Sequence, residues 1–544
     1  MMRHTYVRSL YFLHVFQQMG YKTNEYWRWL REHWEEKVVV KEVVFMNLVL
    51  FAVVALVYFY GYNITSTAIT LALLIYGIFW FASVKKFKHV NVKKPLVFTS
   101  RVKRLCIPFL VLVAIFPLQF TYVSVTGELL FVGTRAGNFD PGILGVDSLY
   151  LVFGWVFGNM LIPFSMYIAG LVMKPVEKNV QEGFKKQARA KLASMPHLKV
   201  IALTGSYGKT STKFMIRDLL KERYSVCSTP GSFNTPMGIC KVINNDLEAH
   251  HQILILEMGA RYEGNIQELC DIARPDVAVI TNVGVAHLET FGSQEVIARE
   301  KGTLVRNLQG GVAVLNADDD LVMAMKEYEN EFATIEAGVT RGDIIGSEIS
   351  YGVKGTSFNV DFGDGEVEEF QIQLLGAHNV QNLLLAIGVA RFFNIRPRTM
   401  ALAATQIEPV EHRLELKNRN GIFVIDDAFN SNPTGAKNAV EILAQFDTGK
   451  RIIITPGMIE LGEMEEEENK AFGRVIGEGN LDLIVLVGPE RSIPIKEGID
   501  EIDNQSDKVE VVGSLFEANE LVFKQANPGD VVLYENDLPD VFNE

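Results

Sequence analysis

Several protein classes are excluded by what this sequence lacks. Only four cysteines occur in 544 residues, and none has CxxC spacing, so neither a zinc site nor a disulfide framework is predicted. Aspartate and glutamate (65) outnumber lysine and arginine (52), and the net charge of −13 leaves no basic face to neutralise a nucleic-acid backbone. No small-residue cleavage site follows an apolar segment near the N-terminus, so a cleavable signal peptide is not expected. We therefore expect no nucleic-acid partner.

Charged residues are also missing from three long stretches, 43–84, 105–127 and 148–173. Each is near or above the roughly 20 residues that cross a hydrocarbon core, and a polar turn at 61–67 divides the first. Four transmembrane helices are therefore predicted within residues 37–173, at about 43–62, 64–84, 105–126 and 148–173.

The loops between these stretches predict the topology. Eight lysines and arginines lie between residues 85 and 104, whereas the first loop has none and the third has only Arg135. The positive-inside rule then predicts a multi-pass protein of the cell membrane, in contact with membrane lipid. Its N-terminus and everything after residue 173 would be cytoplasmic, on the side where ATP is.

Residues 1–36 are rich in aromatic and basic side chains but contain no run long enough to cross a bilayer. This mixture is typical of helices that lie at the membrane interface, with aromatic rings at headgroup depth. A small globular cap is the alternative interpretation. Residues 174–195 are charged and predict a helical linker to the rest of the chain.

A phosphate-binding loop is predicted in the segment Thr204-Gly-Ser-Tyr-Gly-Lys-Thr-Ser211, which follows an apolar run. A buried strand, a glycine-containing loop and a helix start direct backbone N–H groups and the positive end of a helix dipole at one anion. Lys209 adds a full positive charge, and the Thr210 hydroxyl can coordinate Mg²⁺. The strict pattern has glycine where this chain has Leu203, so a structural turn is the competing interpretation.

Apolar strands alternate with helical patterns beyond this loop. The strands are predicted at 253–257, 277–281 and 312–316. That rhythm is typical of a parallel sheet covered by helices, and it predicts a central α/β phosphate-loop ATPase domain at 196–410. Period-two alternation near 345–375 indicates a small antiparallel insertion.

A second series of apolar strands follows, at 423–426, 452–455, 483–487 and 531–534. It predicts a C-terminal α/β, Rossmann-like domain at 411–544 with its own sheet. The expected fold is therefore multi-domain, with a four-helix transmembrane region followed by two α/β domains.

Polar side chains are found where two of the central strands end. Glu257 closes one apolar strand, and Asn282 and His287 follow the next. Because ligands of open α/β sheets bind at the carboxyl edge, we expect these side chains to lie together near the phosphate loop. A carboxylate there would suit Mg²⁺, which takes hard oxygen ligands. A surface cap for Glu257 and a structural role for His287 are the plainer alternatives.

Five ordered motifs resemble the Mur ligase family, the ATP-dependent amide-forming ligases of cell-wall peptide assembly. They are the phosphate loop, Glu257-Met-Gly-Ala260, Thr281-Asn-Val-Gly-Val-Ala-His287-Leu-Glu-Thr-Phe-Gly-Ser293, Gly376-Ala-His-Asn379-Val-Gln-Asn382 and Asp426-Asp-Ala-Phe-Asn-Ser-Asn-Pro433. The resemblance covers about residues 195–540. It is closest to the branch that adds D-alanyl-D-alanine to UDP-N-acetylmuramoyl-tripeptide.

The resemblance implies a role for each matching residue. ATP would be bound by Thr204, Gly205, Ser206, Gly208, Lys209, Thr210, Ser211, Asn282, Asn382, Arg413 and Asp427. Within that set, Asn382 would contact the adenine, Arg413 the phosphates and Asp427 the ribose. Two Mg²⁺ ions would be held by Thr210, Glu257, His287 and Lys301.

Lys209, Lys301 and His287 are the implied catalytic residues. Lys301 matches a family lysine that is carbamylated, and carbamylation turns a cation into an anionic oxygen ligand for Mg²⁺. The family usually has alanine before this lysine, where this chain has Glu300. The implied reaction transfers a phosphoryl group from ATP to a substrate carboxylate, and an amine then attacks the acyl phosphate to give an amide.

Two features depart from the family pattern. Only about 25 residues separate the last predicted span from the phosphate-loop strand, so no UDP-sugar-binding domain fits there. The segment Glu535-Asn-Asp-Leu-Pro539 is acidic where the family has a basic turn. We therefore expect a carboxylate-bearing envelope precursor presented at the membrane, UDP-linked or lipid-linked, and an amine donor such as an amino acid or D-alanyl-D-alanine. A poly-γ-glutamate-type synthase and a non-catalytic ATP-binding membrane scaffold are the alternatives.

Overall fold

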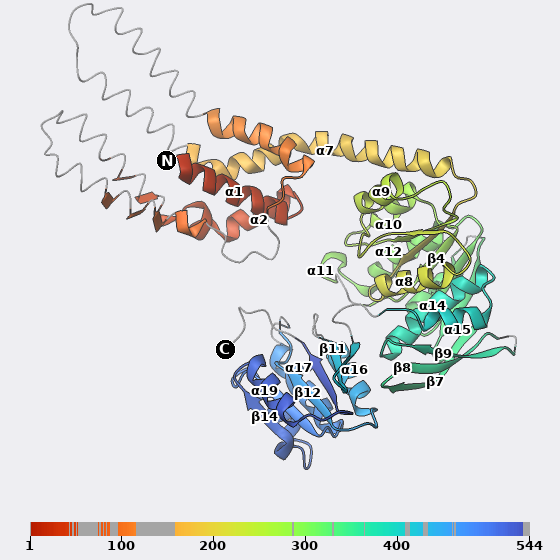
Figure 1. Ribbon diagram of the computed structural model, residues 1–544. Coiled ribbons are helices and arrows are strands. Elements are labelled where there is room, and N and C mark those ends of the chain that lie inside the picture. Colours follow the sequence, from red (N-terminus) through yellow and green to blue (C-terminus); the bar gives the residue numbers. More distant parts are fainter. Residues whose placement is uncertain are drawn as a thin grey trace, which may run out of the picture. The chain divides into compact units, whose positions relative to one another are not determined.

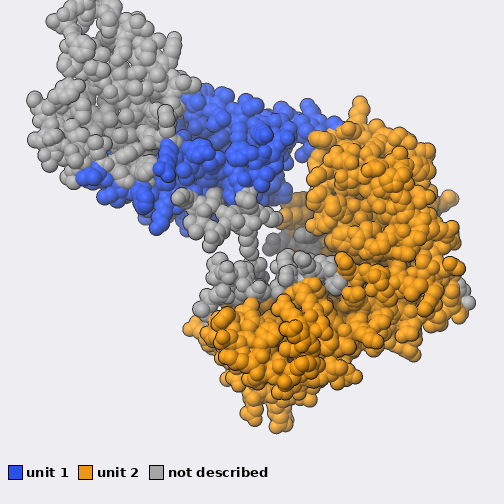
Figure 2. Space-filling model, in the orientation of Figure 1, with its two compact units in different colours: residues 1–183 blue, residues 184–544 orange. Residues whose placement is uncertain are grey.

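The chain divides into two compact units, residues 1–183 and 184–544, which are drawn in blue and orange in Figure 2. The computed structural model describes residues 2–42, 44–45, 48–49, 52, 74–75, 78–79, 81–82, 84–87, 96–115, 158–284, 288–328, 331–363, 365–408, 414–427, 433–459, 461 and 464–536. Figure 1 shows the helices and strands of each unit.

The first unit is helical where it is described. It contains α1 (Met2–Gln18), α2 (Thr23–Glu32), the short π-helix η1 (Trp34–Val38), a helix over 100–115 and the first part of α7 (Ile162–Ala193). Its core buries Phe12, Phe16 and Tyr26 against side chains of the later helices. Helices in the first 36 residues were predicted, and part of their aromatic set forms this core.

The predicted transmembrane helices lie largely outside the described residues. This holds for most of 43–62 and 64–84, for 116–126 of the third span and for 148–157 of the fourth. In the part of the chain that is described, no helix is both long and apolar enough to cross a membrane. The rest of the fourth predicted span and the predicted linker form one 32-residue helix, α7, which continues through Pro175.

The second unit begins with a nine-stranded sheet in the order β2-β3-β1-β4-β5-β6-β7-β8-β9. Its strands are β1 (Lys199–Thr204), β2 (Val226–Ser228), β3 (Ile253–Glu257), β4 (Val277–Ile280), β5 (Val312–Asn316), β6 (Ala333–Gly338), β7 (Ile344–Gly352), β8 (Gly355–Asp361) and β9 (Val367–Ile372). Strands β1 to β7 pair in parallel, as the sequence predicts for the central domain. The antiparallel segment near 345–375 is confirmed, and β7 joins it to the same sheet.

Helices cover both faces of this sheet. They are α8 (Lys209–Leu220), α9 (Pro236–Asn245), α10 (Asn265–Ile272), α11 (Leu288–Phe291), α12 (Gln294–Arg306), α13 (Asp320–Met323), the 3₁₀ turn η3 (Ala324–Glu327), α14 (Ala377–Phe392) and α15 (Pro397–Ala404). Two hydrophobic cores result, because successive strand residues point to opposite faces.

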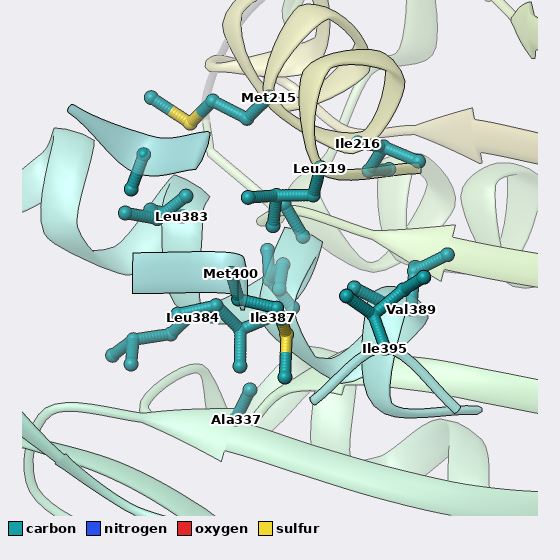
Figure 3. Packing of buried hydrophobic residues seen from close by; sticks show 14 of the residues in the cluster. Met215, Ile216, Leu219, Ala337, Leu383, Leu384, Ile387, Val389, Ile395 and Met400 are labelled. Carbon is teal, nitrogen blue, oxygen red and sulfur yellow. The ribbon is translucent and has the colours of Figure 1, made fainter. Parts of the chain in front are cut away.

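Helix α14 is apolar on nearly all sides and lies buried against α8. Leu219 of α8 and Leu383 and Ile387 of α14 are fully buried in the same core, which Figure 3 shows from close by. This packing fixes the start of α8, and with it the phosphate loop, against the first turns of α14.

The last part of the chain forms a six-stranded sheet in the order β10-β11-β15-β12-β13-β14. Its strands are β10 (Glu415–Arg419), β11 (Ile422–Asp427), β12 (Arg451–Thr455), β13 (Leu483–Val487), β14 (Val509–Val512) and β15 (Val531–Glu535). Its helices are α16 (Pro433–Ala444), α17 (Glu465–Glu478), α18 (Ile493–Asp500), η5 (Ser506–Lys508) and α19 (Leu515–Gln525). All pairs are parallel except β10 with β11, so both α/β sheets are mixed.

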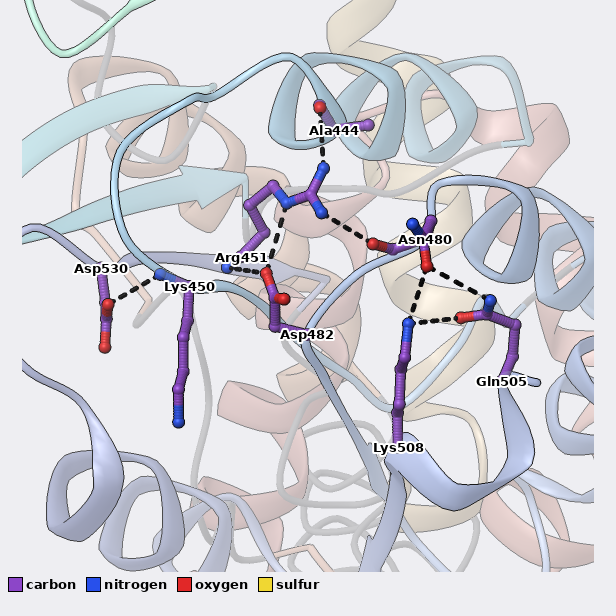
Figure 4. Close-up of polar contacts among 8 residues, drawn as sticks. All are labelled: Ala444, Lys450, Arg451, Asn480, Asp482, Gln505, Lys508 and Asp530. Carbon is purple, nitrogen blue, oxygen red and sulfur yellow. Dashed lines mark hydrogen bonds and ion pairs between the residues drawn. The ribbon is translucent and has the colours of Figure 1, made fainter.

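Polar contacts tie together the amino ends of the strands in this second sheet (Figure 4). The Arg451 guanidinium donates to the carbonyls of Ala444 and Asn480 and to the carboxylate of Asp482, at 3.1, 2.8 and 3.3 Å. Nearby, Asp530 accepts the backbone N–H of Lys450 at 2.7 Å. One arginine therefore binds the last carbonyl of α16, one loop carbonyl and one acid at the amino edge of the sheet.

Candidate active site

The predicted phosphate loop connects β1 to α8, as the sequence indicated. Gly208 precedes the helix with φ = 76°, a left-handed conformation that glycine adopts without a steric penalty. A Cβ at Gly208 would collide with the Asn382 amide, and one at Gly205 would collide with the Thr281 hydroxyl. Both glycines are therefore required by close approach of neighbouring side chains.

The segment after β4 holds this loop in shape. Asn282 Oδ1 accepts the backbone N–H groups of Ser206 and Tyr207 at 3.1 and 2.8 Å, and the Thr281 hydroxyl donates to the Tyr207 carbonyl at 2.6 Å. The Ser206 hydroxyl donates to the Gly284 carbonyl at 3.1 Å and accepts the Gly284 N–H at 2.8 Å. Asn282 and Ser206, both predicted to bind nucleotide, lie at the loop and support its backbone.

Lys209 points back over the loop. Its ammonium donates to the carbonyls of Gly205 and Ser206 at 2.8 and 3.0 Å. The hydroxyl of Thr204 is fully buried and has no hydrogen-bond partner within the described structure. Ser211 lies half-buried in the first turn of α8. A buried donor without a partner and a lysine over the loop backbone suit an anion that brings its own acceptor oxygens.

Glu257 ends β3 at the same edge of the sheet, because β1 pairs in parallel with β3 and with β4. Its side chain is 1% exposed and accepts three hydrogen bonds. Oε2 accepts from the Thr210 hydroxyl at 2.9 Å and from the Lys213 ammonium at 3.2 Å, and Oε1 accepts from the Asn234 amide at 3.1 Å. Burial lowers the pKa of Lys213, and the Glu257 carboxylate opposes that shift.

Lys213 and Asn234 were not predicted from the sequence. Lys213 follows Lys209 by four residues, which places both on one face of α8, and this spacing was the available signal. Asn234 lies in a turn-rich segment before α9, where nothing local indicates a contact with a residue 23 positions away. The loop that carries Asn234 also supplies the Gly231 carbonyl, which accepts a short hydrogen bond from Lys213.

Lys301 lies on α12 and is only 5% exposed. Its pKa is lowered to about 7, chiefly by burial and further by the positive charge of Lys209, while Glu300 opposes the shift. Glu300 itself turns to the start of α10, where its carboxylate accepts the backbone N–H groups of Gly264 and Ile266 at 2.8 and 2.7 Å. Glu300, where this chain departs from the family pattern, thus stabilises the start of α10. Lys301 instead feels the positive charge of Lys209 in the phosphate loop.

The other predicted site residues are placed less completely. His287 and Arg413 lie outside the described residues. Asn382 is buried beside Gly208, and its Oδ1 accepts the Thr212 hydroxyl at 3.2 Å. Asp427 ends β11, and its Oδ1 accepts the Leu414 N–H at 3.2 Å.

The acidic C-terminal segment begins inside the second sheet. Glu535 is fully buried at the end of β15, and its Oε2 accepts the Thr455 hydroxyl at 3.0 Å. The next side chain, Asn536, donates to the Gly457 carbonyl at 2.6 Å. The carboxylate of Glu535 therefore holds the turn after β12 and does not present its charge to solvent.

The residues present fit a Mg²⁺ site that takes further ligands from the substrate. Within the described ranges, no group of three or more His, Cys, Asp or Glu side chains could hold a metal ion. Glu257 and Thr210 nevertheless provide hard oxygen donors in direct contact. Mg²⁺ sites of this kind use one or two carboxylates, waters and substrate phosphates. The donor set matches an ion that arrives with a nucleotide.

Comparison with known families matches both α/β parts of the chain. Residues 203–390 match the family described as Mur ligase middle domain, and residues 412–534 match the Mur ligase, glutamate ligase domain. The UDP-N-acetylmuramoyl-tripeptide–D-alanyl-D-alanine ligase of Bacillus subtilis is 32% identical over 346 residues, which cover 62% of this chain and 72% of that protein. The ligase of the same name from Mycobacterium tuberculosis is 34% identical over 359 residues, covering 62% and 70%.

Two solved structures of MurF are also similar to this chain. MurF from Acinetobacter baumannii shares 28% identity with a TM-score of 0.56, over 66% of this chain and 77% of that one. MurF from Thermotoga maritima, solved in complex with ADP, has the same identity and TM-score over 66% of this chain and 80% of that one.

Proposed function

Because this chain belongs to the Mur ligase family and is an ATP-dependent peptide ligase of cell-wall synthesis, we propose that it works at the membrane on a bound envelope precursor. The observation that carries the ligase mechanism is the meeting of Lys209, Thr210 and Glu257 at the carboxyl edge of one sheet. The nucleotide-bound relative from Thermotoga maritima supports ATP as the energy source.

In this proposal the phosphate loop binds the ATP phosphates. The Thr204 hydroxyl and the N–H groups at the start of α8 donate to phosphate oxygens, and Lys209 exchanges its two loop carbonyls for them. Arg413 and Asp427 complete nucleotide binding from the C-terminal domain at 411–544, and Asn382 contributes from α14. The central domain at 196–410 carries all the other site residues.

The carboxylate substrate attacks the γ-phosphoryl group, the bond to the β-phosphate oxygen breaks, ADP leaves, and an acyl phosphate forms. An amine then attacks the acyl carbon, and the tetrahedral intermediate releases phosphate and leaves an amide. Lys209 neutralises charge that gathers on the transferred group. Thr210 and Glu257 would hold one Mg²⁺, and His287 with a carbamylated Lys301 would hold a second. Bound Mg²⁺ would supply further charge neutralisation.

Membrane attachment is the second part of the proposal. The uncharged stretches 43–84, 105–127 and 148–173 support it, and so do exposed apolar side chains on the described helix 100–115. Ile107, Leu110 and Val111 are 67%, 60% and 60% exposed, with the spacing of a single helical face. Carbonate extraction of membranes from expressing cells should leave the full chain in the pellet. Recovery of the chain in the carbonate wash would overturn this part.

A substrate held at the membrane follows from the same features. In the described residues directly before the phosphate loop the chain forms the helix α7, with no α/β domain there, so we propose a lipid-linked or otherwise membrane-presented carboxylate. Purified protein in nanodiscs should turn over a polyprenyl-linked peptide faster than a soluble UDP-linked peptide. Turnover of only the soluble substrate contradicts this part.

A phosphate-release screen that crosses carboxylate acceptors with amine donors tests the ligase function. ADP and phosphate should appear only when both substrates are present, and Lys209→Ala should reduce turnover by at least a hundredfold. Lys221→Ala is a matched control because Lys221 directly follows the same helix and is 49% exposed. Repeated addition of glutamate would indicate a poly-γ-glutamate-type synthase. Full activity in Lys209→Ala, or nucleotide binding without turnover, refutes the proposed mechanism.

A further inference from the structure

The proposed metal ligand Glu257 forms a buried ion pair with Lys213, which serves as its counter-ion. Lys213 is 0% exposed and Glu257 is 1% exposed, and their charged atoms lie 3.2 Å apart. The Lys213 ammonium also donates to the Gly231 carbonyl, so it is held by two acceptors from two different segments. The negative charge of Glu257 is therefore balanced before any metal ion arrives.

Among the described residues, no other acidic group contacts this pair. Thr210 and Asn234, which also contact the Glu257 carboxylate, are neutral. Lys209 adds a positive charge on the neighbouring loop, and the described residues contain no acidic cluster that could hold a metal by itself. A divalent cation approaching this site without a nucleotide meets no net negative charge.

Glu257 keeps the capacity to bind a metal once anionic oxygens are supplied. Oε2 is occupied by Thr210 and Lys213, while Oε1 accepts only the Asn234 amide among the described residues. A carboxylate offers about four lone-pair sites, so one remains on Oε1. The phosphate groups of a nucleotide would bring the missing negative charge and further oxygen ligands.

We propose that Lys213 makes divalent-metal binding at Glu257 conditional on bound nucleotide. Lys213 is a positioning residue here: it neutralises Glu257 and ties it to the Gly231 loop, so that Mg²⁺ enters only together with the phosphates of ATP. The inference rests on the proposed role of Glu257 as a metal ligand. It concerns the order in which ligands bind and not the chemical step.

The test is a titration of the full-length protein with Mn²⁺, followed by electron paramagnetic resonance, with and without a non-hydrolysable ATP analogue. Wild type should bind Mn²⁺ at this site only with the nucleotide analogue. Lys213→Met, which keeps the length of the side chain and removes its charge, should bind nucleotide-free Mn²⁺ at least tenfold more tightly. Lys221→Met, at the exposed end of the same helix, should behave as wild type.

Removal of one partner from a buried ion pair can prevent folding, so stability is measured as well. Mn²⁺ without nucleotide should raise the Tm of Lys213→Met, because the ion replaces the missing cation. It should not raise the Tm of wild type or of the double variant Lys213→Met/Glu257→Gln. If Lys213→Met folds only when Mn²⁺ is present, the proposal is supported; if Mn²⁺ does not restore folding, it fails.

Two further results would overturn the inference. One is equal Mn²⁺ affinity of wild type with and without nucleotide. The other is a folded Lys213→Met variant that binds nucleotide-free Mn²⁺ no better than wild type. These readouts need neither the carboxylate nor the amine, so a wild-type protein that forms no amide would refute the proposed function and leave this inference standing.

Discussion

The pKa of Lys301 leads to a prediction about pH and carbon dioxide. A carbamate forms when a neutral amine attacks CO₂, so an ordinary lysine, whose pKa is near 10.4, hardly reacts at neutral pH. Lys301 is 5% exposed, and its pKa is lowered to about 7 by burial and by Lys209. The neutral amine therefore predominates above about pH 7, and protonation blocks the reaction below it.

The size of the effect follows from that value. At about pH 7.5, about three-quarters of Lys301 side chains would be neutral, against about one in a thousand for an unperturbed lysine. At about pH 6 the neutral fraction falls to about one-tenth. Carbamate formation releases a proton to solvent, so lower pH also opposes it at equilibrium. At a fixed concentration of dissolved CO₂, the initial rate of carbamate formation should therefore fall by roughly eightfold between these two pH values.

The assay is ¹³C nuclear magnetic resonance of protein equilibrated with ¹³C-bicarbonate, run beside ADP release. Wild type should show a bound carbamate signal that weakens together with activity as the pH falls. Lys301→Gln should lose the signal and most of the activity, and Lys301→Arg should do the same because a guanidinium stays charged. Full activity in bicarbonate-depleted buffer, or in Lys301→Arg, would refute the reasoning.

Three substitutions test other parts of the structure. Glu300→Ala should lower the free energy of unfolding by about 1–3 kcal/mol in urea titrations, because the N–H groups of Gly264 and buried Ile266 at the start of α10 lose their acceptor. An unchanged midpoint would contradict that role. Gly208→Ala should weaken nucleotide binding at least tenfold by calorimetry, because its Cβ meets Asn382, whereas Gly264→Ala, also at positive φ but in open space, should bind nucleotide as wild type. Arg451→Met should destabilise the second sheet by about 1–3 kcal/mol while nucleotide affinity stays unchanged; a loss of affinity without a loss of stability would argue against a structural role.

The sequence predicted eight of the strands because each is an apolar run bounded by polar or glycine residues: β1, β3, β4, β5, β11, β12, β13 and β15. Four strands that are short or partly exposed were not predicted: β2, β6, β10 and β14. The ends of β1, β3 and β4 could be placed at one edge on that basis, and Glu257 lies there. Side-chain contacts between distant segments could not be predicted. The bonds from Lys213 and Asn234 to Glu257 span 44 and 23 residues, and they depend on how a turn-rich loop folds over the sheet edge.

In the N-terminal part, too, local sequence patterns could not predict the structure completely. The charge change after residue 173 predicted a boundary between a span and a linker, yet α7 continues through it. A helix is maintained by its own backbone hydrogen bonds, so a change from apolar to charged side chains changes its surroundings and not its conformation. The aromatic residues of 1–36 were ambiguous for a similar reason, since a ring suits a helical core as well as a lipid headgroup.

The arginine at the amino edge of the second sheet has a consequence for how this domain can diverge. Arg451 and Asp530 secure the incoming ends of the strands, while Asp427 and Glu535 lie at the outgoing ends. A change in the segments that follow these two residues leaves the incoming attachments intact, so those segments can vary at less cost to the fold. The amino edge serves as a fixed frame for the sheet when the segments beyond Asp427 and Glu535 change.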